Sequence, residues 1–210
     1  MDNRIWGILA IGAACSAAGC AASNASGGAS DNGSGGGAGL TGDGGAFSLP
    51  SQGAVTLSVE RSTSPANGRT CPDPGTTYPA GDPAPTNTNP GGSLVDGDRG
   101  AQVSCAVQGT SSFTFSGSLD ATTSDQGYPI RVDFTEGQVG ADLDGTAHVS
   151  IYTPKLGGSF VGQACTVQVI AKQIKGGAMW ASFSCPTLAL LPSGLCAASG
   201  VFVFENCLGS

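Results

Sequence analysis

Cysteines are the residues of this 210-residue chain whose number and spacing most constrain its chemistry. Of the eight, Cys15 and Cys20 lie within the first twenty residues. None belongs to a C-x-x-C pair, and the single histidine, His148, is distant from them in sequence, so disulfides are favoured over a zinc site. The six that remain are an even number, as expected for three bridges in an exported chain. They are Cys71, Cys105, Cys165, Cys185, Cys196 and Cys207.

The pairing of these six cysteines is only partly constrained by their positions. If residues 199–206 form a strand at about 3.3 Å per residue, Cys196 and Cys207 lie roughly 30 Å apart, whereas bridged Cα atoms are about 5–6 Å apart. We therefore expect these two to have other partners. A Cys165–Cys185 bridge across a hairpin puts both sulfurs on one face but requires an odd-numbered loop. The favoured scheme joins Cys71 to Cys105, Cys185 to Cys196, and Cys165 to Cys207.

Residues for acid-base or nucleophilic catalysis are few, and we predict that the chain is not an enzyme. A serine hydrolase needs a base beside its nucleophile, and His148 is the only histidine; there is also no G-x-S-x-G elbow. His148, Ser150 and Tyr152 alternate along one predicted strand, an arrangement that we interpret as a solvated strand face. Nothing in the sequence singles out a carboxylate pair for glycoside hydrolysis. The carboxylates considered are Asp133, Glu136, Asp142 and Asp144.

Two acidic turns could offer the oxygen ligands that calcium prefers. They are Asp142-Leu143-Asp144-Gly145 and Asp96-Gly97-Asp98. Neither continues into the twelve-residue EF-hand spacing with its terminal glutamate, and Asp and Gly are common in turns for conformational reasons. We predict no metal and no cofactor.

The charge balance excludes one class of partner. The chain carries 15 acidic and 8 basic residues, a formal net charge of −7. Nucleic-acid binding depends on Lys and Arg contacts to phosphate, and adhesion to anionic lipid depends on basic clusters. We therefore expect no nucleic-acid partner and no polybasic contact with a membrane.

The first 19 residues have the composition of a signal peptide. Arg4 supplies a positive charge, residues 5–14 are apolar, and small residues follow. An apolar run of about ten residues is too short to span a hydrocarbon core, which requires about twenty residues as a helix. The segment is therefore expected to be removed after export.

Ala17, Ala18, Gly19 and Cys20 resemble the lipobox of bacterial lipoproteins, although position 17 is Ala where Leu is usual. The resemblance implies cleavage before Cys20 and attachment of lipid, including palmitate, to that cysteine. Membrane contact would then be made through the lipid. The resemblance also implies that Ala21, the residue after the lipidated cysteine, is compatible with delivery to the outer membrane or cell surface if the cell has two membranes. The alternative is ordinary secretion after cleavage near Ala22.

The composition of the remaining chain divides it into a tether and a single domain. Residues 20–46 are rich in Gly and Ser and nearly free of bulky apolar side chains, which predicts a disordered, flexible tether after the lipidated cysteine. Such a coil has a reach of about 25–30 Å. Residues 47–210 have the length of one domain.

Period-two alternation of apolar and polar residues predicts that this domain is all-β, an antiparallel β-sandwich of about eight strands. Gly176-Gly177 is expected to form the turn of a hairpin. The last three strands are apolar on both faces and should be central. The predicted strands are 54–61, 101–108, 112–119, 128–135, 146–153, 164–172, 178–185 and 199–206.

Residues 64–92 contain seven prolines and are predicted to be a long surface loop that cannot pair inside a sheet. Tyr78 is the only aromatic residue in this segment and is expected to pack on the surface. Long loops often carry binding function, so this segment is the candidate binding element.

These features predict a cell-envelope lipoprotein that serves as a structural or interaction module, with an envelope protein or a glycan as possible partner. The alternative is a secreted or anchored module that binds a glycan, peptide or calcium through residues 64–92. An envelope hydrolase is the third hypothesis.

Overall fold

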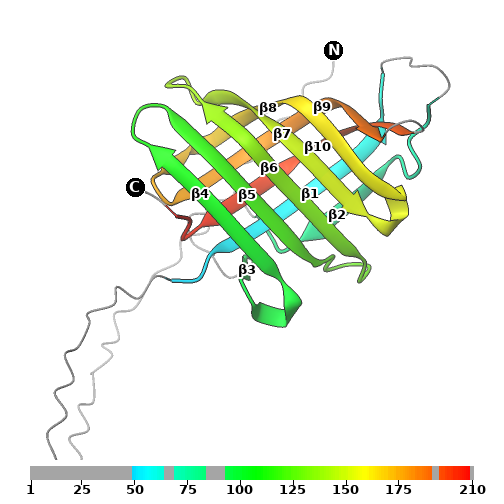
Figure 1. Cartoon of the computed structure of the whole chain (residues 1–210), viewed down its shortest axis with the longest axis horizontal. Helices are drawn as coiled ribbons and strands as arrows, with labels where there is room; N and C mark the ends of the chain where they lie inside the picture. Colours follow the sequence, from blue (N-terminus) through cyan, green and yellow to red (C-terminus); the bar gives the residue numbers. More distant parts are fainter. Residues whose placement is uncertain (1–48, 64–68, 84–92, 191–193, 209–210) are drawn as a thin grey trace, which may run out of the picture. The chain divides into compact units, whose positions relative to one another are not determined.

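The computed structural model describes residues 49–63, 69–83, 93–190 and 194–208 (Figure 1). Ala46–Ser210 forms one compact unit. The predictions for the signal peptide, Cys20 and the tether lie outside the described residues. Short 3-10 helices lie between consecutive strands: η2 (Asp98–Gly100) and η3 (Pro154–Leu156). Among the described residues, no helix has the length and apolar character needed to cross a membrane.

In the described part of the chain, ten strands form one antiparallel sheet, in the order β2-β1-β10-β9-β8-β7-β6-β5-β4, with β3 paired to β1. The all-β, antiparallel prediction is confirmed. Each of the eight predicted strands is present, and the last three are central. The bounds are β1 (Gln52–Arg61), β2 (Thr76–Ala80), β3 (Leu94–Val95), β4 (Gln102–Gly109), β5 (Phe113–Thr122), β6 (Pro129–Val139), β7 (Asp144–Thr153), β8 (Gly158–Lys175), β9 (Ala178–Leu190) and β10 (Gly194–Glu205).

The sheet curls so that its two halves pack on each other as the layers of the predicted sandwich (Figure 1). Phe134 of β6 and Phe202 of β10 lie four strands apart in the sheet, yet their ring centroids are 4.2 Å apart. Phe115 of β5 stacks on Phe202 at 5.9 Å, and Phe183 of β9 meets Phe134 edge-on at 5.3 Å. These aromatic contacts form the centre of the core.

Alternation along each strand decides which side chains enter that core. In β7, Ala147, Val149 and Ile151 are buried, while His148 is half-buried and Tyr152 is exposed on the outer face. Successive side chains of a strand point to opposite faces of a sheet, so burial of the apolar set places the polar set outside. The same pattern in β4, β5 and β6 leaves Ser, Thr and Gln on the outer face.

The prediction that residues 64–92 form a surface loop throughout is wrong for β2. Thr76–Ala80 pairs with β1 as an edge strand, where Pro79 is tolerated because one side of an edge strand needs no donor. Tyr78 is 1% exposed, so its predicted surface position is also wrong. Its hydroxyl donates to the Asp73 carboxylate at 2.5 Å.

At the opposite edge, the segment after β10 covers part of β4. The amide of Leu208 donates to the carbonyl of Cys105 at 2.9 Å, and the amide of Val107 donates to the carbonyl of Leu208 at 3.0 Å. The outer edge of β4 is therefore paired over these residues, although it ends the strand order. A covered edge cannot pair with another chain.

All six cysteines of the domain are bridged, as predicted, but the favoured pairing is wrong. Cys196 and Cys207 have separate partners, as expected from the extended β10 between them. The predicted Cys71–Cys105 pair fails because the curled sheet places each of these residues next to a distant segment. The bridges are Cys71–Cys196, Cys105–Cys207 and Cys165–Cys185.

The Cys165–Cys185 bridge, the rival hypothesis, is made possible by an irregularity in the β8–β9 hairpin. Lys175 pairs with Ala178 around the two-residue Gly176-Gly177 turn. If this pairing continued unchanged along the hairpin, Cys165 and Cys185 would not lie opposite each other. The register then shifts between Val169 and Ile174, so that farther along the hairpin the two cysteines lie opposite each other. This bulge replaces the odd-numbered loop that the bridge was expected to require.

Candidate functional site

Outward side chains from nine strands line up in one row across the outer face of the sheet. Each member is paired directly with the next in the strand register. All are uncharged amides or hydroxyls, and all but the half-buried Ser58 are exposed. We call them the polar row: Gln108, Thr114, Gln138, Thr146, Thr166, Ser184, Ser199, Ser58 and Thr77.

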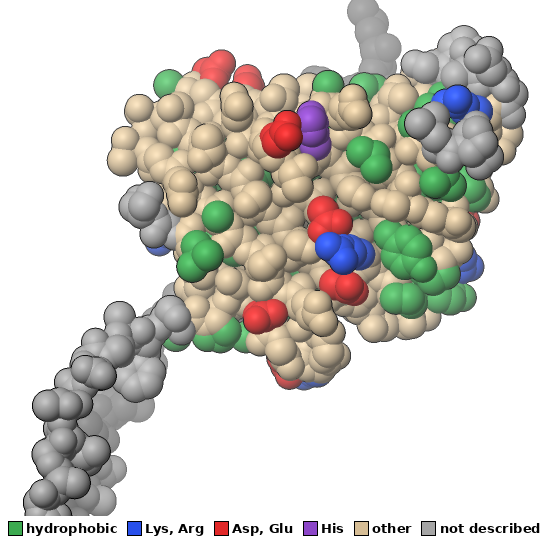
Figure 2. All heavy atoms as spheres, viewed as in Figure 1, with side chains coloured by type: hydrophobic (Ala, Val, Ile, Leu, Met, Phe, Trp, Pro, Cys, Tyr) green, Lys and Arg blue, Asp and Glu red, His purple; other side chains and the backbone are tan. Residues whose placement is uncertain are grey.

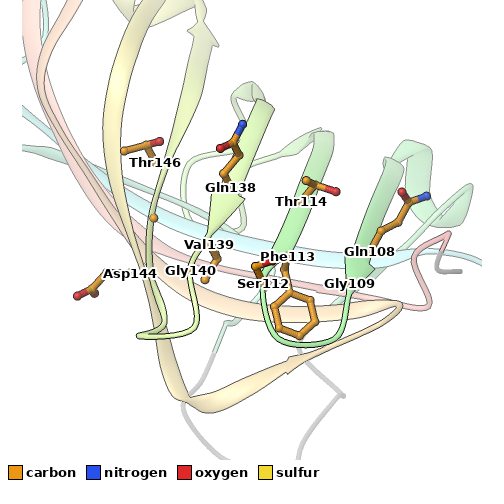
Figure 3. Close-up of a pocket in the computed structure, with 11 residues that line it drawn as sticks. Gln108, Gly109, Ser112, Phe113, Thr114, Gln138, Val139, Gly140, Asp144 and Thr146 are labelled. Carbon is orange, nitrogen blue, oxygen red and sulfur yellow. The ribbon is translucent and has the colours of Figure 1, made fainter.

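The surface is hollowed at the β4 end of the polar row. A cavity of about 580 Å³ is lined by the ends of β4 to β7, and a second cavity of about 390 Å³ adjoins it and shares Gln108, Thr114 and Gln138. We call the two together the β4–β7 groove. Its volume is in the range of small-ligand sites. Figure 3 shows the labelled side chains of Gln108, Thr114, Gln138 and Thr146 extending from neighbouring strands.

The four members of the polar row that line the groove have no side-chain partners within the described part of the chain. Gln108, Thr114, Gln138 and Thr146 make no side-chain hydrogen bond to another described residue. Elsewhere in the row, by contrast, the Ser58 and Thr77 hydroxyls hydrogen-bond to each other at 2.9 Å. A Gln amide both donates and accepts, as does a Thr hydroxyl, so the groove offers both functions to a ligand.

The charge lining the groove is sparse and of one sign. Asp144 and Glu136 line it, and no Lys or Arg is found among its described lining residues. Beyond the groove, Arg131 is already paired with Asp133, whose carboxylate accepts from its Nε at 3.0 Å and raises the pKa of Arg131. The groove therefore suits an uncharged ligand better than an anion.

His148 lies beside a carboxylate that the sequence did not associate with it. Its Nδ1 is 3.4 Å from Oε2 of Glu136, which has φ of +52° at a bulge in β6. The purple His148 side chain lies next to a red acidic side chain in Figure 2. No hydroxyl of the described residues hydrogen-bonds to His148, and the Ser150 and Ser159 hydroxyls bond to each other at 2.8 Å. The pair thus lacks an activated nucleophile.

The other candidate carboxylates do not converge on one point. Asp133 is occupied by Arg131 and by the hydroxyl of Ser118 at 2.7 Å. Asp96 accepts from the amide of Val103 at 2.8 Å, which holds the start of β4. Within the described residues, no group of three or more His, Cys, Asp or Glu side chains comes together as a metal site would require.

Of the residues lining the groove, sequence reasoning named Glu136 and Asp144 as candidate carboxylates but did not single out the polar row. The sequence did contain one signal for these residues, the scarcity of charged side chains at outward strand positions. Their alignment into one row across the strands depends on the register of strand pairing, which the sequence pattern does not show. No family model, curated protein or solved structure matches the chain, so a functional proposal rests on the sequence and structure of the chain itself.

Proposed function

We propose that the protein is a non-catalytic interaction module of the cell envelope, held at a membrane by a lipid on Cys20. The observation that carries the proposal is the complete pairing of Cys71, Cys105, Cys165, Cys185, Cys196 and Cys207. Three bridges indicate an oxidising compartment outside the cytoplasm. The six described cysteines are all paired with one another, so none of them is left to pair with Cys20.

A binding role is better supported than catalysis. The contact between His148 and Glu136 is the one feature that favours a hydrolase, and it includes no nucleophile among the described residues. The sheet instead presents an outer face with a groove in which four uncharged polar side chains have no partner among the described residues. Binding through residues 64–92, the earlier alternative, has less support because Thr76–Ala80 is part of the sheet and Tyr78 is buried.

Metabolic labelling with a fatty acid tests the attachment. We expect label in the wild-type chain and in Cys15→Ala, no label in Cys20→Ala, and release of Cys20→Ala from the membrane fraction into the soluble envelope fraction. Cys15→Ala is the matched control because it removes the other cysteine of the leader. Equal labelling of wild type and Cys20→Ala would contradict lipidation at Cys20.

A further inference from the structure

We infer that the β4–β7 groove is a binding site for a neutral glycan. The inference deepens the proposed function, which brings the domain to the outside of the cytoplasm, where such chains occur. It is carried by the four members of the polar row that lie in the groove: Gln108, Thr114, Gln138 and Thr146. Three properties of this set support it, namely spacing, unpartnered hydrogen-bonding groups and absence of charge.

The spacing of the four side chains is regular because it is set by the sheet. Gln108 pairs with Thr114, Thr114 with Gln138, and Gln138 with Thr146. Adjacent strands are about 4.8 Å apart, so the four span about 14 Å. This step is close to the advance per sugar of an extended glycan, which lets successive sugars meet successive side chains.

The chemistry of the set matches a chain of hydroxyl groups. A sugar hydroxyl donates one hydrogen bond and accepts others, and each Gln or Thr can return both. The four side chains are exposed and have no protein partner among the described residues, so a ligand replaces water without breaking internal hydrogen bonds. Each side chain exchanges a hydrogen bond to water for one to the ligand, so the net gain per contact is small and several contacts are needed.

The positions are held in place by a close approach of β6 and β7. A Cβ added at Gly145 would lie 1.9 Å from the carbonyl oxygen of Gln138, so only glycine permits the two strands to pair there. Thr146 follows directly and is thereby kept opposite Gln138. The backbone that presents these side chains is therefore preformed, which leaves only side-chain ordering to the entropic cost of binding.

The acidic residues of the groove determine which glycans are disfavoured, and its lack of exposed aromatic surface limits the affinity. Asp144 and Glu136 at the lining disfavour uronic acids and phosphate- or sulfate-bearing glycans. Two aromatic residues are found among the described residues that line the groove, Phe113 at 7% exposed and Phe115 at 4% exposed, and they offer little surface for stacking. Without a stacking platform, we expect a dissociation constant on the order of 1 mM, strengthened by multivalency at a membrane surface.

The test uses the exported chain carrying Cys20→Ala, so that lipid does not interfere, and titrates it with defined oligosaccharides in an NMR chemical-shift assay. The probes are hexamers of β-1,4-glucose, β-1,4-N-acetylglucosamine and α-1,4-glucose, with oligogalacturonate as the anionic probe. We expect saturable shifts at amides of β4 to β7 with at least one neutral hexamer and none with oligogalacturonate.

Variants on β4, β5 and β6 distinguish the groove from the rest of the outer face. Gln138→Ala and Thr114→Val should each weaken binding by about three- to tenfold, the effect of losing one hydrogen bond. Gln102→Ala on β4 and Thr122→Val on β5 are matched controls, because both side chains are exposed but do not line the groove. Their affinity should equal that of the parent, and all four variants should keep its melting temperature.

Three results would overturn the inference: no shift with any neutral hexamer, preference for the anionic probe, or equal affinity of the groove and control variants. None of these three results tests Cys20, so the proposals of lipidation and membrane retention are tested separately by the labelling experiment. Conversely, glycan binding by a chain that is never lipidated would leave the groove intact and remove the proposed anchor.

Discussion

Tyr78 shows how a single polar side chain is accommodated in the core. It lies in the edge strand β2, is 1% exposed, and donates its hydroxyl to Asp73, five residues earlier. Burial and the neighbouring carboxylate both favour the neutral phenol, so the pKa of Tyr78 is raised above its ordinary value. The hydrogen bond joins Asp73, which precedes β2 in the chain, to Tyr78 within β2.

Replacing Tyr78 should change stability in a pH-dependent way. At neutral pH, Tyr78→Phe is expected to cost about 1 kcal/mol, because the buried hydrogen bond is lost. Above about pH 10 the unfolded phenol releases its proton while the folded one retains it, so wild-type stability falls by about 1.4 kcal/mol per pH unit from this group. Tyr78→Phe has no phenol to ionise and does not lose this stability. The stability advantage of the wild type over the variant should therefore shrink as the pH rises above about 10 and then reverse.

Urea unfolding between neutral and alkaline pH measures this effect. Tyr152→Phe, at a position that is 43% exposed, controls for removal of a tyrosine hydroxyl as such. A difference in the free energy of unfolding between wild type and Tyr78→Phe that stayed constant across the whole pH range would contradict a raised pKa for Tyr78 in the folded state.

At the scale of elements, the three bridges join very different lengths of chain. Cys165–Cys185 closes 20 residues within the β8–β9 hairpin, whereas Cys105–Cys207 spans 102 residues and ties β4 to the segment after β10. The hairpin bridge supports strands that already pair along their length. The longer bridge holds together parts of the sheet that are remote in sequence.

Removal of these two bridges should therefore have unequal costs. In the chain-entropy description, the Cys105→Ala/Cys207→Ala variant should lose about 1.5 kcal/mol more than Cys165→Ala/Cys185→Ala, because the longer loop restricts the unfolded chain more. Urea unfolding of both double variants, after non-reducing peptide mapping of the bridges that remain, measures the difference. A larger loss for the hairpin variant would show that local packing outweighs loop closure.

The molecule as a whole depends on its bridges for stability. Each contributes about 2–4 kcal/mol, so three together approach the total stability of a typical domain, about 5–15 kcal/mol. Without the bridges, the aromatic core and the strand pairing would have to offset the full entropic cost of closing long loops. Folding is therefore coupled to oxidation.

Reduction should consequently unfold the domain under conditions in which the oxidised form is native. We expect loss of amide dispersion in the NMR spectrum on addition of a thiol reductant at neutral pH, and its recovery on reoxidation. The oxidised chain with oxidised reagent at the same concentration is the control. A reduced chain that kept the native spectrum would show that noncovalent packing suffices.

Much of the fold follows from local pattern, because alternation determines which face of a strand is buried. Ala147, Val149 and Ile151 illustrate this, since their spacing alone predicts their burial. Pro79 was misleading, because proline counts argue against strands but do not identify an edge where proline is tolerated. The polar row and the Cys165–Cys185 bridge depend on register and on a bulge, which are set by contacts between distant segments rather than by neighbours in sequence.

The order in which cysteines leave the cytoplasm conflicts with the order in which they pair. A chain exported N-terminus first presents Cys71 and Cys105 before their partners, which follow 125 and 102 residues later. An oxidase that joined cysteines as they emerged would link these two to each other and leave β4 without its covering segment. Maturation of this sheet therefore requires either delayed oxidation or an isomerase that exchanges an early bridge for the native pair.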